Sequence, residues 1–140
     1  TSLDVTIQDQ VLRLLRTLVE EKNTCIILIT HTLGVVRETT DRVCVMYAGN
    51  MVEVARTQSL FERPLHPYTR GLMGAVPRLS GGGVSDGIPG RIPSYLSPPA
   101  GCRFHPRCPE VMDICRNTKP PLVQADGDHR VACFLHVQER

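Results

Sequence analysis

Four cysteines in the last third of the chain have side chains that can bind a metal. Cys102, Cys108, Cys115 and Cys133 are separated by five, six and seventeen residues. They lie in a segment with few apolar residues, and a segment that buries little apolar surface needs another source of stability. Because thiolates bind zinc and iron, the cluster predicts a metal site. Disulfides and four reduced thiols without metal are the alternatives.

The spacing of the four cysteines leaves the metal open. Structural zinc sites usually take their thiolates in pairs two to four residues apart, which this spacing does not provide. A 4Fe-4S cluster also takes four thiolates and tolerates looser spacing. Three histidines are near enough in sequence to replace a cysteine, which would favour zinc: His105, His129 and His136. Three arginines lie beside the cysteines and would favour thiolate over thiol: Arg103, Arg107 and Arg116.

A second candidate for chemistry is His31. It follows residues 25–30, a continuous run rich in β-branched side chains that predicts a strand buried on both faces of a mostly parallel sheet. Ligands bind outside the carboxyl ends of such strands, and an imidazole there can donate to a phosphate oxygen. A lone histidine at a strand end is otherwise an ordinary loop residue.

The elements that would position these residues follow from the apolar pattern. A helix is expected over 5–22, with Thr6 and Asp9 as a capping box. A short helix over 33–40 precedes a hairpin of strands 42–47 and 51–55, and short helices are expected at 57–62 and 68–76. A helix followed by a buried strand predicts an α/β architecture.

The rest of the chain offers little regular structure. Ser80–Gly83 and the proline-rich stretch to Pro99 predict a linker, and few elements are expected after it. Cys25 and Cys44 fall within expected strands and are predicted to be buried apolar residues.

The composition narrows the class of protein. Hydrophobic residues make up 41% and charged residues 21%, which is typical of a folded domain. The net charge is +2 and no Lys/Arg stripe alternates with aromatic residues, so nucleic-acid binding is not expected. The longest apolar run, 25–29, is far shorter than the roughly 18 residues of a membrane span.

Several motifs, taken in order, resemble the second half of an ABC-transporter nucleotide-binding domain. They are Thr1–Gln8 (TSLDVTIQ), Ile27–His31 (ILITH), Asp41–Val43 and Val45–Gly49. Arg63–Leu72 (RPLHPYTRGL) resembles the His-Pro-Tyr segment of the oligopeptide/dipeptide import branch. The resemblance implies an α/β, P-loop NTPase-like fold truncated to its C-terminal half, residues 1–62. A loop-rich extension with the cysteines, residues 63–140, would follow.

The resemblance also implies roles for two residues. Asp4 corresponds to the D-loop aspartate at the dimer interface, and His31 to the switch histidine that contacts the γ-phosphate of ATP. Ser2 and Thr32 depart from the usual alanine and aspartate. The sequence has no G-x-x-x-x-G-K-[ST] loop, and the signature and Walker B motifs would lie upstream. The full-length protein is therefore expected to use ATP and Mg²⁺, and this chain alone to be inactive.

The remaining expectations rest on the same resemblance. The protein would work on the cytoplasmic side of the cell membrane, with transmembrane permease subunits, a second ATP-binding subunit, identical or related, and indirectly an extracytoplasmic peptide-binding protein. Reduced thiols there disfavour disulfides. Some family members carry an iron–sulfur cluster in this extension, which favours 4Fe-4S on the four cysteines, with Zn²⁺ as the alternative. A small metal-binding interaction module is the alternative function. The chain alone is expected to self-associate, because a central strand would lack its neighbours.

Overall fold

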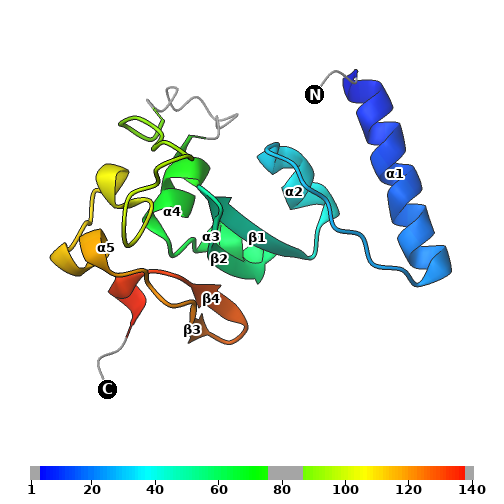
Figure 1. The fold of residues 1–140 in the computed structure, drawn as a ribbon. Coiled ribbons are helices and arrows are strands. Elements are labelled where there is room, and N and C mark those ends of the chain that lie inside the picture. Colours follow the sequence, from blue (N-terminus) through cyan, green and yellow to red (C-terminus); the bar gives the residue numbers. More distant parts are fainter. Residues whose placement is uncertain (1–3, 76–86, 138–140) are drawn as a thin grey trace. The chain divides into compact units, whose positions relative to one another are not determined.

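The computed structural model describes residues 4–75 and 87–137 (Figure 1). The chain divides into two compact units, Thr1–Thr40 and Asp41–Arg140. Each unit is described by itself below. The linker predicted at Ser80–Gly83 lies outside the described residues.

The first unit contains helices α1 and α2, whose bounds are Val5–Lys22 and Leu33–Thr39. Both agree with the apolar pattern. The predicted capping box is wrong: Asp4 is the N-cap, and its carboxylate accepts a hydrogen bond from the Thr6 amide at 2.8 Å. Asp9 instead forms an ion pair with Arg13, one turn along the helix. An ionised N-cap accepts from the first free amides of the helix and suits the positive end of its dipole.

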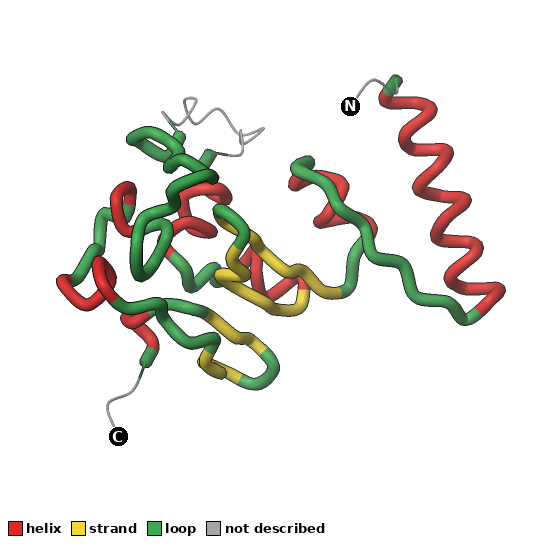
Figure 2. The backbone as a smooth tube through the Cα atoms, in the orientation of Figure 1, coloured by secondary structure: helices red, strands yellow, loops and turns green. Residues whose placement is uncertain are grey.

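The strand predicted over residues 25–30 is not formed. Figure 2 shows the segment between α1 and α2 as a loop, and Ile27 and Ile29 are 91% and 94% exposed. A strand exists only through hydrogen bonds to a neighbouring strand. The described part of this unit has no second strand to supply them. Cys25, predicted to be buried, is consequently exposed.

The second unit is built on an antiparallel sheet, so the expected parallel sheet is not present in the described residues. The strand order is β1-β2-β4-β3. The strands are β1 Arg42–Tyr47, β2 Asn50–Arg56, β3 Val123–Asp126 and β4 His129–Val131. The predicted hairpin is confirmed as β1 and β2. Ala48 and Gly49 both have positive φ in its two-residue turn, which matches the twist of the strands.

The C-terminal segment contributes more regular structure than its composition indicated. β4 pairs with β2, so residues after 120 complete the same sheet as the hairpin. The helices of this unit are α3 Thr57–Glu62, α4 Pro67–Gly74 and α5 Asp113–Asn117, with 3₁₀ turns at His105–Arg107 and Phe134–His136. The hairpin and the cysteine-containing segment therefore share one framework.

An aromatic cluster joins these parts. The Phe104 ring, 1% exposed, packs edge-on against Tyr47 of β1 with centroids 5.1 Å apart, and against Tyr68 of α4 at 5.4 Å. Such tilted pairs stabilise a core beyond the area they bury. Cys44 points to the other side of β1 and is exposed, so its predicted burial is wrong. Among the described residues, no helix is long and apolar enough to cross a membrane.

Candidate functional site

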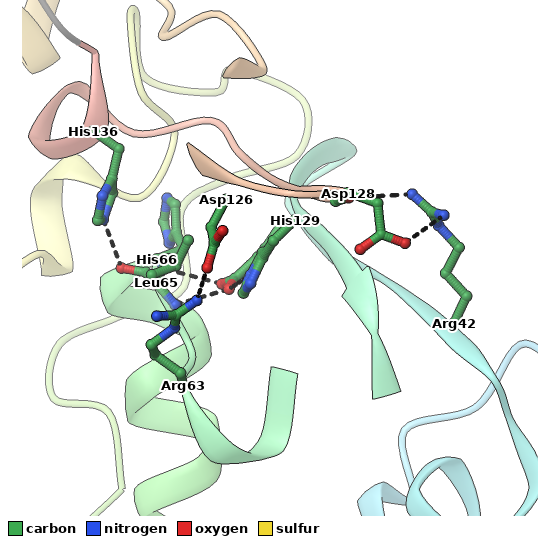
Figure 3. A network of polar contacts seen from close by, with 9 residues as sticks. Arg42, Arg63, Leu65, His66, Asp126, Asp128, His129 and His136 are labelled. Atoms are coloured by element: carbon green, nitrogen blue, oxygen red, sulfur yellow. Dashed lines mark hydrogen bonds and ion pairs between the residues drawn. The ribbon is translucent and has the colours of Figure 1, made fainter. Parts of the chain in front are cut away.

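Glu53 is a buried carboxylate at the centre of the second unit. It lies on β2 between Val52 and Val54 and is fully buried. Oε1 accepts from the Leu65 amide at 2.8 Å and from His129 Nε2 at 2.7 Å, and Oε2 accepts from the His66 amide at 2.9 Å. Figure 3 shows this network. Glu53 thus ties together the hairpin, the His-Pro-Tyr segment and β4.

The contacts of His129 show which of its ring nitrogens donates to Glu53. His129 is 2% exposed, and its Nδ1 has no hydrogen-bond partner among the described residues. A protonated Nδ1 would be a buried donor without an acceptor, which is costly, whereas a bare Nδ1 leaves only a lone pair unused. The geometry therefore places the donating ring hydrogen on Nε2, which bonds Glu53 Oε1.

The His-Pro-Tyr segment makes a helix start. His66 is the N-cap of α4, and its Nδ1 accepts from the Tyr68 amide at 3.0 Å. Pro67 follows at the first helical position, where its missing N–H costs nothing. Burial lowers the pKa of His66 to about 4, against the opposing charge of Glu53. The ring is consequently neutral near pH 7, with its proton on Nε2.

Charged residues surround this buried network at the surface. Arg63 pairs with Asp126, and Asp128 accepts from Arg42 at 3.3 Å (Figure 3). Asp128 also accepts from Arg56 at 3.3 Å. All are substantially exposed, so water screens them and each contributes little to stability. These ion pairs align the β3–β4 turn with β1 and β2. The buried carboxylate of Glu53 stabilises the connection between these elements.

The four predicted cysteines come together. Cys102, Cys108, Cys115 and Cys133 all line one pocket, hereafter the cysteine pocket, together with His66 and His105. Of the three histidines expected as replacement ligands, only His105 lines it, and its Nδ1 bonds the Cys102 carbonyl at 2.9 Å. His129 is committed to Glu53, and His136 Nε2 donates to the Leu65 carbonyl at 3.4 Å.

Three thiols of the cysteine pocket, those of Cys102, Cys108 and Cys133, are harder to ionise than ordinary cysteines. Burial raises the pKa of Cys102 and of Cys108, and it raises the pKa of Cys133 to about 11, with the other three thiols adding to the shift. The expectation that nearby arginines favour thiolate is therefore wrong for Cys102 and Cys108. Arg103 donates to the Ala48 carbonyl, and Arg107 donates to the carbonyls of Ile88 and Pro89.

The cysteine pocket is not a ready-made single-ion site. Within residues 4–75 and 87–137, no group of three or more His, Cys, Asp or Glu side chains is placed to hold a metal ion. One tetrahedral zinc holds each sulfur at about 2.3 Å and thus brings the four sulfurs within about 4 Å of one another. A four-iron cluster binds its thiolates on separate irons and spaces them further apart.

The other two predicted site residues lie in the first unit. Asp4 is exposed, and hydrogen bonds from Thr6 lower its pKa. His31 is exposed in the bend before α2. In the part of this unit that the structure describes, no hydrogen bond or ion pair joins Asp4 to His31. Their predicted roles concern ATP and a second subunit, and they remain predictions.

Sequence reasoning missed Glu53. Its signal was a single carboxylate inside the apolar run Val52–Ala55, close in sequence to the His-Pro-Tyr segment. A charged residue at a buried strand position needs polar partners, and here they are the Leu65 amide, the His66 amide and His129.

Comparisons with known proteins show what this chain is similar to. Residues 52–115, which contain most of β2, the His-Pro-Tyr segment and three of the four cysteines, match the family model described as the oligopeptide/dipeptide transporter, C-terminal region. The resemblance drawn from the motifs is confirmed: the homologues of this chain are ATP-binding proteins of oligopeptide and dipeptide transporters.

Three relatives show the extent of the similarity. The oligopeptide transport ATP-binding proteins AppD of Bacillus subtilis and OppD of Salmonella typhimurium are each 49% identical over 140 residues. The dipeptide transport ATP-binding protein DppD of Caldanaerobacter subterraneus is 42% identical over 141 residues. The matches cover 99%, 99% and 100% of this chain and 43%, 42% and 43% of the relatives. The chain therefore spans less than half the length of these relatives.

Proposed function

We propose that this chain is part of the ATP-hydrolysing subunit of an importer for oligopeptides or dipeptides. The observation that carries the proposal is the similarity over nearly the whole chain to proteins named as transport ATP-binding proteins for these substrates. The subunit would sit at the cytoplasmic face of the membrane. It would bind permease subunits and a second ATP-binding subunit, and act indirectly with an extracytoplasmic peptide-binding protein.

In this proposal His31 and Asp4 serve the ATP site of the complete protein. His31 donates a hydrogen bond to the γ-phosphate, and Asp4 lies at the interface with the second ATP-binding subunit. Mg²⁺ neutralises phosphate charge when bound, with ligands supplied by the rest of the subunit. Exposure of His31 just after an extended segment is compatible with a ring that meets a ligand.

The test is ATP hydrolysis by the full-length subunit assembled with its permease. His31→Ala should lower kcat about 100-fold, the usual effect of losing one positioned donor. Glu38→Ala, an exposed change on α2, is the control and should leave kcat unchanged. Equal rates for both variants would remove His31 from the mechanism. The 140-residue chain alone should release no phosphate above a protein-free blank.

We also propose that the cysteine pocket binds a 4Fe-4S cluster, with Zn²⁺ as the alternative. The observation behind this proposal is that all four thiols line one pocket. When bound, the cluster would cross-link residues distant in sequence, and Cys102, Cys108, Cys115 and Cys133 would each hold one iron. The test measures iron, zinc and acid-labile sulfide in anaerobically purified protein. About four irons and four sulfides per chain support the cluster. One zinc per chain supports the alternative. A chain that contains neither iron nor zinc would refute both proposals.

The alternative of an independent metal-binding interaction module has no support here. A separate module would have its own sheet, whereas β4 pairs with β2 of the hairpin. The buried carboxylate of Glu53 joins the same parts. The cysteine region is thus built as an extension of the hairpin.

A further inference from the structure

The cysteine pocket depends on two backbone segments that touch. The Cys102 amide donates to the Cys115 carbonyl at 2.9 Å, where the loop that follows Gly101 passes the last turn of α5. The Cys102 carbonyl in turn accepts from the His105 amide at 2.9 Å. These bonds hold Cys102 beside Cys115, although the two residues are far apart in sequence.

Gly101 is the residue at which this contact is closest. A Cβ at this position would lie 2.9 Å from the Arg116 carbonyl carbon, 3.0 Å from its oxygen and still nearer the Cys115 carbonyl oxygen. All three atoms belong to the backbone, so no side-chain rotation relieves the overlap. Gly101 also has φ +66°, a conformation that disfavours side chains. Two independent constraints therefore require glycine.

We propose that Gly101 is a positioning residue that sets the separation of Cys102 and Cys115 and thereby allows the cysteine pocket to bind a four-thiolate cofactor. This proposal rests on the metal-binding function proposed above. A methyl group at Gly101 would have to move the loop by roughly 1 Å to reach ordinary van der Waals contact. Metal sites tolerate displacements of only about 0.5 Å in their ligands.

The chain contains a matched control. Gly127, in the β3–β4 turn, has φ +53°, but a Cβ there meets nothing within 4 Å. Gly101→Ala and Gly127→Ala therefore share the backbone strain, and only Gly101→Ala adds the overlap with α5. The difference between the two variants isolates the close contact at the cysteine pocket.

The first experiment measures metal retention by the 140-residue chain. Each variant is reconstituted with ferrous iron and sulfide, and separately with zinc, and then challenged with a chelator. Gly101→Ala should hold metal about 10- to 100-fold less tightly than the parent chain, the range for loss of supporting interactions around ligands. Gly127→Ala should match the parent. Equal retention by Gly101→Ala and the parent would overturn the proposal.

A second measurement needs no metal and separates the two proposals. Amide hydrogen exchange on the metal-free chain should show faster exchange at Cys102 in Gly101→Ala, with β1 and β2 still protected. Loss of protection throughout the sheet would make Gly101 a general folding residue and overturn the proposal. If the parent binds neither iron nor zinc, the metal-binding function fails. In that case the exchange rate of the Cys102 amide still tests whether Gly101 positions Cys102.

Discussion

Replacing Glu53 with glutamine should destabilise the second unit by about 3–5 kcal/mol, because one buried donor loses its acceptor and two charge-assisted hydrogen bonds become ordinary ones. The carboxylate accepts hydrogen bonds from the Leu65 amide, the His66 amide and His129 Nε2. A glutamine side chain has one oxygen and one NH₂ group, so it can replace only part of this set.

The best orientation of glutamine shows where the energy is lost. Its oxygen would take the Oε1 position and accept from Leu65 and His129. Its NH₂ group would then face the His66 amide, donor against donor, at a distance that is 2.9 Å in the parent chain. A buried amide left without an acceptor costs about 1–3 kcal/mol, and two charge-assisted bonds become ordinary ones.

The assay is urea denaturation at pH 7.5, followed by far-UV circular dichroism and tyrosine fluorescence, since Tyr47 and Tyr68 lie in the affected core. Glu62→Gln is the control because Glu62 is exposed on α3 and accepts a hydrogen bond from Gln58 of its own helix at 2.9 Å. The control should change the free energy of unfolding by less than about 0.5 kcal/mol. A loss below about 1 kcal/mol for Glu53→Gln would refute the assignment of Glu53 as the central buried acceptor.

Three further predictions concern protonation, thiol reactivity and association. His66 binds a proton at about pH 4 when folded and near 6.5 when unfolded, so its contribution to stability is complete above pH 6.5 and is lost as the pH falls toward 4. Urea midpoints at pH 7 and pH 4.5 should reveal a loss on the order of 3 kcal/mol that His66→Asn, which keeps an N-cap acceptor, does not show. In the metal-free chain at pH 7.5, iodoacetamide should alkylate Cys102, Cys108 and Cys133 about tenfold more slowly than the exposed Cys25 and Cys44, as read by peptide mass spectrometry. Equal rates would contradict the raised pKa values of these three thiols. The exposed Ile27 and Ile29 should make the chain self-associate at micromolar concentration, and glutamate at both positions should abolish this; a monodisperse parent monomer in light scattering would exclude it.

Local pattern predicted the elements whose stabilising contacts are local. Both helices of the first unit, the β1–β2 hairpin and α3 fall where the apolar spacing and the Ala48-Gly49 turn placed them. The strand expected at residues 25–30 failed because a strand depends on partners elsewhere in a chain. The same dependence explains β4, which has a weak pattern of its own but gains a partner in β2.

The candidate site also has features that the sequence predicted and features that it did not. The cysteines could be selected from residue type alone, because thiols in a segment with little core have few other uses. The raised pKa values of Cys102 and Cys108 could not be foreseen, because burial outweighs the nearby Arg103 and Arg107, whose guanidinium groups bond backbone carbonyls instead. The three donors to Glu53 could not be predicted, because they come from positions up to 76 residues away.

The shared sheet makes the hairpin and the cysteine region one cooperative unit in thermodynamic terms. Anything that binds only the folded form of the cysteine pocket also raises the free energy required to separate β4 from β2, by RT ln(1 + [L]/Kd). A ligand bound in the cysteine pocket would thus slow the opening of β1 and β2 and raise the melting temperature of the second unit. Conversely, a substitution in the hairpin would weaken ligand binding at a pocket that it never touches.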